Sequence, residues 1–218
     1  MAARRDRSNA LVYYNRGISY DALGLTDLAL ADYDHSIRHD PYYAFTWNNR
    51  GFVYASLGDW AQAINDYTQA IALDPTYATA FNNRAIAYVN IGKFMEGRAD
   101  YEKALELNPE YFEAQYNYGI LMYKQGDYQT AMNAFHSVIK SDIEKTPQMW
   151  NNHGSAMHRL GQYSNAIISY TEALKLDPDY ELARLNRAIA YSDLGEYDLA
   201  VDDYSELLAS NPYRYDLY

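Results

Sequence analysis

Six asparagines recur at nearly constant spacing along this sequence, in short segments such as "WNNRG" at residues 47–51. They are Asn15, Asn49, Asn83, Asn117, Asn152 and Asn186. Three of these segments carry a further asparagine one residue earlier, at Asn48, Asn82 and Asn151. A carboxamide has hydrogen-bond donors and acceptors, so a row of them can pair with the backbone of another chain whatever its side chains are. Recognition of a polypeptide is therefore one chemistry that these residues could perform.

Catalytic and metal-binding chemistry has little support in the sequence. Cysteine is absent, which excludes disulfides, thiol nucleophiles and thiolate metal sites. His35 and His39 are four residues apart, a spacing that can hold a metal ion on a helix, but no third ligand completes a recognised motif. We therefore expect no catalytic residue, no bound metal and no cofactor.

The asparagines belong to an internal repeat. Two residues after each of them stands a small residue, here called the marker. The markers are Gly17, Gly51, Ala85, Gly119, Gly154 and Ala188. Successive markers are 34 or 35 residues apart. A period of this length is typical of an architecture whose units stack on their neighbours.

Each period contains the signals of two helices. A glycine seven residues after the marker, such as Gly24, favours the left-handed backbone that ends a helix. A small residue and an aromatic follow at i and i+4, as in Ala29 and Tyr33, and these share one face of the second helix. A proline after Asp or Asn, such as Pro41, ends that helix. The equivalent prolines are Pro75, Pro109, Pro178 and Pro212.

These signals resemble the tetratricopeptide repeat (TPR) family, whose unit of about 34 residues is a helix–turn–helix. The resemblance covers residues 10–214 and implies an all-α fold, a right-handed superhelical solenoid of about six antiparallel helix pairs. In the fourth unit Ile143 takes the proline position and one extra residue precedes Pro147. The expected organisation is an extension at 1–9, a single domain of units 10–43, 44–77, 78–111, 112–146, 147–180 and 181–214, and a tail at 215–218.

In this family the first helix of each unit lines the concave surface of the superhelix. The six asparagines, about 200° around the helix from the markers, would then form a ladder along a groove. The sequence resembles the repeat superhelix of O-GlcNAc transferase in this respect. The alternative is that each asparagine bonds the adjacent unit and fixes the stacking. The groove hypothesis predicts that Asn83→Ala leaves folding stability unchanged, whereas the stacking hypothesis predicts a loss.

Other side chains are predicted to complete the groove. Their spacing from the markers directs Tyr14, Tyr116 and Tyr123 away from the core face, and Phe52 falls on the same surface. Lys124 and Arg159 supply positive charge, so they could hold a local anionic group. The other basic residues with which some co-chaperone members of the family clamp a C-terminal carboxylate are not present.

Arginine and aspartate vary together in the repeat. The residue before the marker is arginine in four units: Arg16, Arg50, Arg84 and Arg187. Fifteen residues after the marker, the same four units carry aspartate: Asp32, Asp66, Asp100 and Asp203. The fourth and fifth units lose both residues. We expect a bridge between the two helices of a unit, because an unpaired, partly buried charge would be costly.

The net charge of −11 disfavours nucleic acid as a partner. No stretch approaches the roughly 18 apolar residues of a membrane span. We expect a non-enzymatic, cytoplasmic interaction module, an adaptor, co-chaperone or assembly factor for a neutral to basic protein or peptide; a mature exported domain fits equally.

One alternative is a self-associating scaffold, a homo-oligomer joined through an apolar C-terminal end. That end comprises Leu207, Leu208, Tyr213, Tyr215, Leu217 and Tyr218. Another is an accessory repeat module of a larger enzyme.

Overall fold

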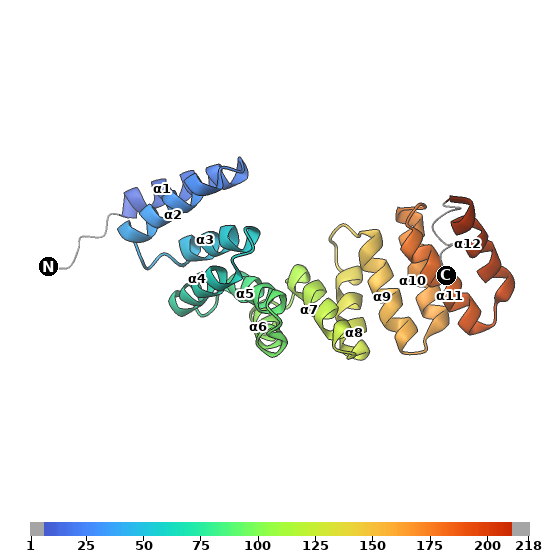
Figure 1. Cartoon of the computed structure of the whole chain (residues 1–218). Coiled ribbons are helices and arrows are strands. Elements are labelled where there is room, and N and C mark those ends of the chain that lie inside the picture. The colour runs from blue at the N-terminus through green and yellow to red at the C-terminus, as the bar shows by residue number, and fades with distance from the viewer. Residues whose placement is uncertain (1–6, 211–218) are drawn as a thin grey trace. The chain divides into compact units, whose positions relative to one another are not determined.

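Residues 7–210 are described by a computed structural model, and they form twelve α-helices without any β-strand (Figure 1). The chain divides into two compact units, Met1–Ala114 and Gln115–Tyr218. The first unit holds α1 (Arg7–Ala22), α2 (Thr26–His39), α3 (Ala44–Ser56), α4 (Trp60–Leu73), α5 (Ala78–Asn90) and α6 (Phe94–Leu107). The second holds α8 (Tyr128–Lys140), α9 (Pro147–Arg159), α10 (Tyr163–Leu176), α11 (Glu181–Leu194) and α12 (Tyr197–Ser210), and α7 (Phe112–Lys124) crosses from the first unit into the second. The prediction of an all-α fold made of consecutive helix pairs is confirmed.

Glycine reverses the chain within each pair. Gly24 has a φ of 71° and Gly195 a φ of 87°, both in the left-handed region that glycine adopts without strain. Tight backbone bonds accompany the turn, such as the one from Leu25 N to Tyr20 O at 2.9 Å. The predicted helix ends are therefore correct.

The marker is small because an aromatic ring of the second helix lies directly on it. A Cβ added at Gly17 would stand 2.8 Å from a ring carbon of Tyr33, and one at Gly119 would stand 2.7 Å from Phe135. Both rings are almost fully buried. This close packing fixes the distance between the two helices of a pair.

Successive pairs are joined by short turns that begin with Asp or Asn. The Oδ1 atom of Asp74 accepts a bond from the backbone N of Thr76 at 2.9 Å, and proline at the next position cannot continue the helix. The junction after α8 is longer, as the sequence indicates. There Thr146 caps α9, its Oγ1 accepting from Met149 N at 3.3 Å, and Pro147 occupies the first turn.

The apolar end of α12 differs from the prediction. Leu207 is 3% exposed, so the expectation that it joins a second copy is wrong; it stands at the repeat position of Ala173 in the preceding pair, which is also buried. Leu208 is 50% exposed. The other residues of the predicted apolar C-terminal end lie outside the described residues; they are Tyr213, Tyr215, Leu217 and Tyr218. Pro212 lies outside the described residues as well.

Candidate functional site

Four Arg–Asp pairs hold the first helix of a pair against the second. In the pair of α3 and α4, Nε and Nη2 of Arg50 each donate to Asp66 at 2.7 Å, and Asp66 is fully buried. The same two-bond geometry joins Arg16 to Asp32, Arg84 to Asp100 and Arg187 to Asp203. The bridge predicted from the covariation is confirmed.

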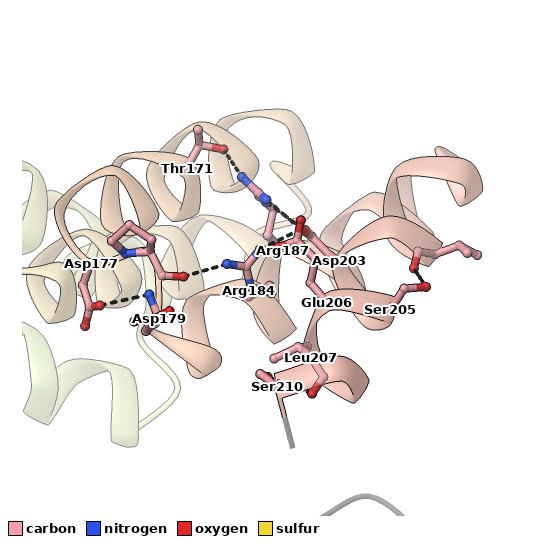
Figure 2. A network of polar contacts seen from close by, with 12 residues as sticks. Thr171, Asp177, Asp179, Arg184, Arg187, Asp203, Ser205, Glu206, Leu207 and Ser210 are labelled. Atoms are coloured by element: carbon pink, nitrogen blue, oxygen red, sulfur yellow. Dashed lines mark hydrogen bonds and ion pairs between the residues drawn. The ribbon is translucent and has the colours of Figure 1, made fainter. Parts of the chain in front are cut away.

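Three of these arginines also reach the preceding helix pair. The Nη1 atom of Arg50 donates to Asp34 at 2.6 Å, and that of Arg187 donates to Thr171 at 3.2 Å (Figure 2). Arg84 makes the same contact with Thr68. Each guanidinium therefore joins three helices and serves the stacking of the repeats.

His153 takes the arginine position in the fifth repeat. Its Nδ1 lies 3.0 Å from the hydroxyl of Ser169, which stands where the other repeats have aspartate. The ring is 3% exposed, and its Nε2 has no hydrogen-bond partner within residues 7–210. Burial, together with the neighbouring His136, lowers the pKa of His153 to about 4. A neutral imidazole thus replaces the ion pair at neutral pH.

Asparagines join the first helices of successive repeats. The Nδ2 of Asn83 donates to Oδ1 of Asn48 at 3.0 Å, which links α5 to α3. The Nδ2 of Asn186 donates to Oδ1 of Asn151 at 2.9 Å, which links α11 to α9. The acceptors Asn48 and Asn151 are buried, as is Asn82. The contact required by the stacking hypothesis is therefore present.

Two further asparagines bond tyrosines of the preceding repeat. The Nδ2 of Asn49 donates to the hydroxyl of Tyr14 at 3.3 Å, and that of Asn152 donates to the hydroxyl of Tyr116 at 2.8 Å. Tyr14 also packs on the core around Tyr33. The expectation that Tyr14 and Tyr116 point away from the core is wrong, because their position on the helix lies in the seam between two repeats.

Asn83→Ala is expected to lower the free energy of unfolding by about 0.5–1.5 kcal/mol, since the buried Asn48 loses its donor. Asn90→Ala on the same helix is the control, because Asn90 is exposed and its Nδ2 donates to Ile86 O within its own helix α5. Urea denaturation measures both variants. Equal stability of the two would contradict a stacking role for Asn83.

Each of the two units contains a cavity that runs along the first helices of its helix pairs. The first pocket has a volume of about 330 Å³ and is lined by Ile18, Asp21, Tyr33, Asn48, Asn49, Phe52, Thr79, Asn83, Tyr111 and Glu113. The second pocket, in the other unit, also has a volume of about 330 Å³ and is lined by Ile120, Tyr123, Lys124, Phe135, Asn151, Asn152, Ser155, Leu182 and Asn186.

The two pockets are built from the same repeat positions. Eight lining residues of one match eight of the other at a separation of 102 or 103 residues. The matches are Ile18 with Ile120, Asp21 with Tyr123, Tyr33 with Phe135, Asn48 with Asn151, Asn49 with Asn152, Phe52 with Ser155, Thr79 with Leu182 and Asn83 with Asn186. The isoleucine and the three asparagines are identical in both. One amide framework therefore occurs twice in the chain.

The remaining predicted site residues divide between the pockets and other places. Phe52, Tyr123 and Lys124 line a pocket. Arg159 does not: its guanidinium lies 4.7 Å from the ring centre of Tyr128, and its Nη2 donates to the Tyr128 hydroxyl. Asn15 is exposed and Asn117 is half-buried.

Sequence reasoning missed Asp21 and Glu113, because the other five repeats carry no acid at the equivalent position. The only sequence signal for Asp21 is an acid near the end of a helix, where negative charge is disfavoured.

The histidine pair considered as a metal site stacks on an aromatic ring. The rings of His35 and His39 lie 4.7 and 5.5 Å from that of Tyr13 on α1. Among the described helices, none is both long and apolar enough to cross a membrane.

Models of protein families match most of the chain. Models described as tetratricopeptide repeat match residues 10–43, 32–65, 82–142 and 183–214, and a model described as TPR repeat matches 53–92 and 154–195.

Curated relatives match over part of the chain. DnaJ homolog subfamily C member 7 of Homo sapiens is 32% identical over 88 residues, 39% of this chain and 18% of that protein. Protein FlbA of Caulobacter vibrioides is 35% identical over 69 residues, 30% of this chain and 12% of that protein. The chain thus spans less than a fifth of the length of these relatives.

Solved structures share the fold. YrrB, described as a TPR protein with an unusual peptide-binding site, matches with a TM-score of 0.78 at 19% identity, over 84% of this chain and 93% of that one. The first TPR of Spaghetti (RPAP3), bound to an HSP90 peptide, matches with a TM-score of 0.56 at 31% identity, over 57% of this chain and 99% of that one.

Proposed function

Because the chain belongs to the tetratricopeptide repeat family, we propose that it is a non-enzymatic adaptor that binds an extended segment of a partner protein along its first helices. The observation that carries the proposal is the duplicated pocket, in which the same asparagines stand beside apolar and aromatic side chains. Structural relatives support it: YrrB and the first TPR of Spaghetti are described with a peptide-binding site and a bound peptide.

The asparagines retain hydrogen-bonding capacity after they have joined the repeats. A carboxamide has two N–H donors and two acceptor lone pairs. The contacts of Asn152 and Asn186 with the preceding repeat each use one N–H. The second N–H and the oxygen of each group can therefore pair with a peptide backbone. The groove and stacking hypotheses are compatible, because one side chain can serve both purposes.

The spacing of the asparagines suits an extended chain. Packed helices lie about 8–10 Å apart, and a strand rises about 3.3 Å per residue. One asparagine would then meet about every third residue of the bound segment. In the second pocket the exposed Lys124 would hold an anionic group of that segment.

A random peptide library displayed on phage and selected against the full chain tests the proposal. Enriched peptides should bind less tightly when Asn49 and Asn83, or Asn152 and Asn186, are both changed to alanine. Two lost amide bonds of about 0.5–1.5 kcal/mol each correspond to roughly a tenfold loss. Asn133 and Asn165, exposed and outside both pockets, give the matched control pair. Failure to enrich any peptide, or binding unaffected by either pocket pair, would refute the proposal.

Self-association is a second candidate function, favoured by one observation. On α12, Val201 is 59% exposed and Leu208 is 50% exposed, whereas Leu174, which matches Leu208 in the preceding repeat, is 8% exposed. A second copy could cover these side chains. Sedimentation should then show a species larger than the monomer at high concentration, and Leu208→Lys should abolish it. A monomer at every concentration would remove this candidate.

A role as an accessory module of a longer protein is a further proposal, since the chain spans only part of its curated relatives.

A further inference from the structure

The two pockets share a framework but differ in charge. The first pocket has Asp21 where the second has Tyr123, and Glu113 adds another carboxylate. Among its described lining residues there is no lysine, arginine or histidine. The second pocket contains Lys124 and, among the lining residues that the structure describes, no aspartate or glutamate. Among the lining residues that the structure describes, the two equivalent pockets thus present opposite charges to a ligand; Asp216, the repeat equivalent of Glu113, lies outside the described residues.

The two carboxylates of the first pocket are not used by the scaffold. Within residues 7–210, neither Asp21 nor Glu113 makes a side-chain hydrogen bond or an ion pair, whereas Arg16, Arg50 and Arg84 of the same unit are all held by other aspartates. Asp21 lies in the last turn of α1, which has no basic residue. Negative charge is unfavourable at that end of a helix, so an external cation would relieve it.

The charges act on the aromatic walls of the pocket. Burial, and after it the charge of Asp21, raises the pKa of Tyr33. Burial, and after it the charge of Glu113, raises the pKa of Tyr111. Each carboxylate therefore lies close enough to a lining ring for its charge to act there.

We propose that the first pocket receives a lysine or arginine side chain of the bound segment. Asp21 and Glu113 hold its charge, and Ile18 and Phe52 cover its alkyl stem. A cavity of about 330 Å³ is large enough for such a group. This inference rests on the proposed function, because the side chain belongs to a segment bound along the asparagines. A positively charged side chain is the feature by which the first pocket would select that segment.

The test starts from the most enriched peptide of the phage selection, synthesised with acetylated and amidated ends. Its basic residue is replaced by citrulline, which keeps the shape of arginine and removes the charge. Titration calorimetry with the full chain should show the citrulline peptide binding at least about tenfold more weakly than the arginine peptide.

The same pair of peptides is then measured on two variants. Asp21→Asn with Glu113→Gln should bind both peptides equally, because the charge that distinguishes them is gone. Asp27→Asn with Glu96→Gln changes the net charge by the same amount at exposed sites outside both pockets. That control should keep the wild-type preference for arginine.

Three results would overturn the inference: enriched peptides without a basic residue, equal binding of the two peptides to the wild type, or loss of the preference in the control variant. Each can occur while the asparagine variants still weaken binding, in which case only the charge selectivity fails. Failure of the library to yield any binder removes the proposed function and the inference with it.

Discussion

Replacing Arg50 by methionine is expected to lower the free energy of unfolding by about 3–5 kcal/mol at neutral pH. The change leaves Asp66 fully buried without the guanidinium that bonds both of its oxygens. Burial already raises the pKa of Asp66, and Arg50 opposes that rise. Without Arg50 the carboxylate should be protonated more readily, so the loss should shrink as the pH falls. Urea denaturation at several pH values measures this.

The double variant Arg50→Met with Asp66→Leu should lose less stability than the two single changes together, because it removes both charges. Arg16 with Asp32 is the matched control. The side chain of Arg16 is 53% exposed, against 16% for that of Arg50. When the arginine is replaced, water should therefore solvate Asp32 more readily than it solvates Asp66. Additive losses at Arg50 and Asp66 would show that the pair is not coupled.

Acidification is expected to destabilise the chain through His153. Its pKa is about 4 in the folded protein and about 6.5 in the unfolded chain. Between these values the unfolded state binds more protons than the folded state. The stability that the folded protein gains from a neutral His153 is therefore complete above about pH 6.5 and is lost as the pH falls toward 4. The loss from this one group should reach about 2–3 kcal/mol near pH 4.5.

His153→Gln isolates the effect, because an amide can still bond Ser169 and does not titrate near neutral pH. The stability difference between wild type and variant should shift in favour of the variant on going from about pH 7 to pH 4.5. The carboxylates and the histidines that do not contact His153 are present in both proteins and cancel in the comparison. Curves that stay parallel over this range would mean that His153 is not buried in its neutral form.

The helices and the Arg–Asp bridges could be predicted because the sequence repeats itself. Six copies of the turn glycine show which residues end helices, and the joint loss of Arg and Asp in two repeats shows that they are partners. His153 with Ser169 could not be recognised as a substitute for such a pair from sequence, since a neutral hydrogen bond leaves no charge pattern.

The contacts of the asparagines could not be derived from helical spacing. A position opposite the marker can face a groove or the seam with the neighbouring repeat. The offset between the first helices of the two repeats decides which of these it faces. Asn83 reaches Asn48 because that offset brings the two carboxamides within 3.0 Å. The sequence predicts Arg159 in the groove, but the ring and hydroxyl of Tyr128, 31 residues earlier, bind its guanidinium.

The most direct test of backbone recognition by the duplicated pockets is calorimetry with a set of N-methylated peptides. Each analogue of the enriched peptide carries one methyl group on a different backbone nitrogen, which removes one donor and leaves every side chain in place. If carboxamide oxygens of the pockets accept backbone N–H groups, at least one analogue should bind about tenfold more weakly on the wild type. It should show a smaller loss on Asn152→Ala with Asn186→Ala, or on Asn49→Ala with Asn83→Ala. If every analogue binds as tightly as the parent peptide, the carboxamide oxygens of the pockets accept no backbone N–H group, and the account of backbone recognition through these oxygens is wrong.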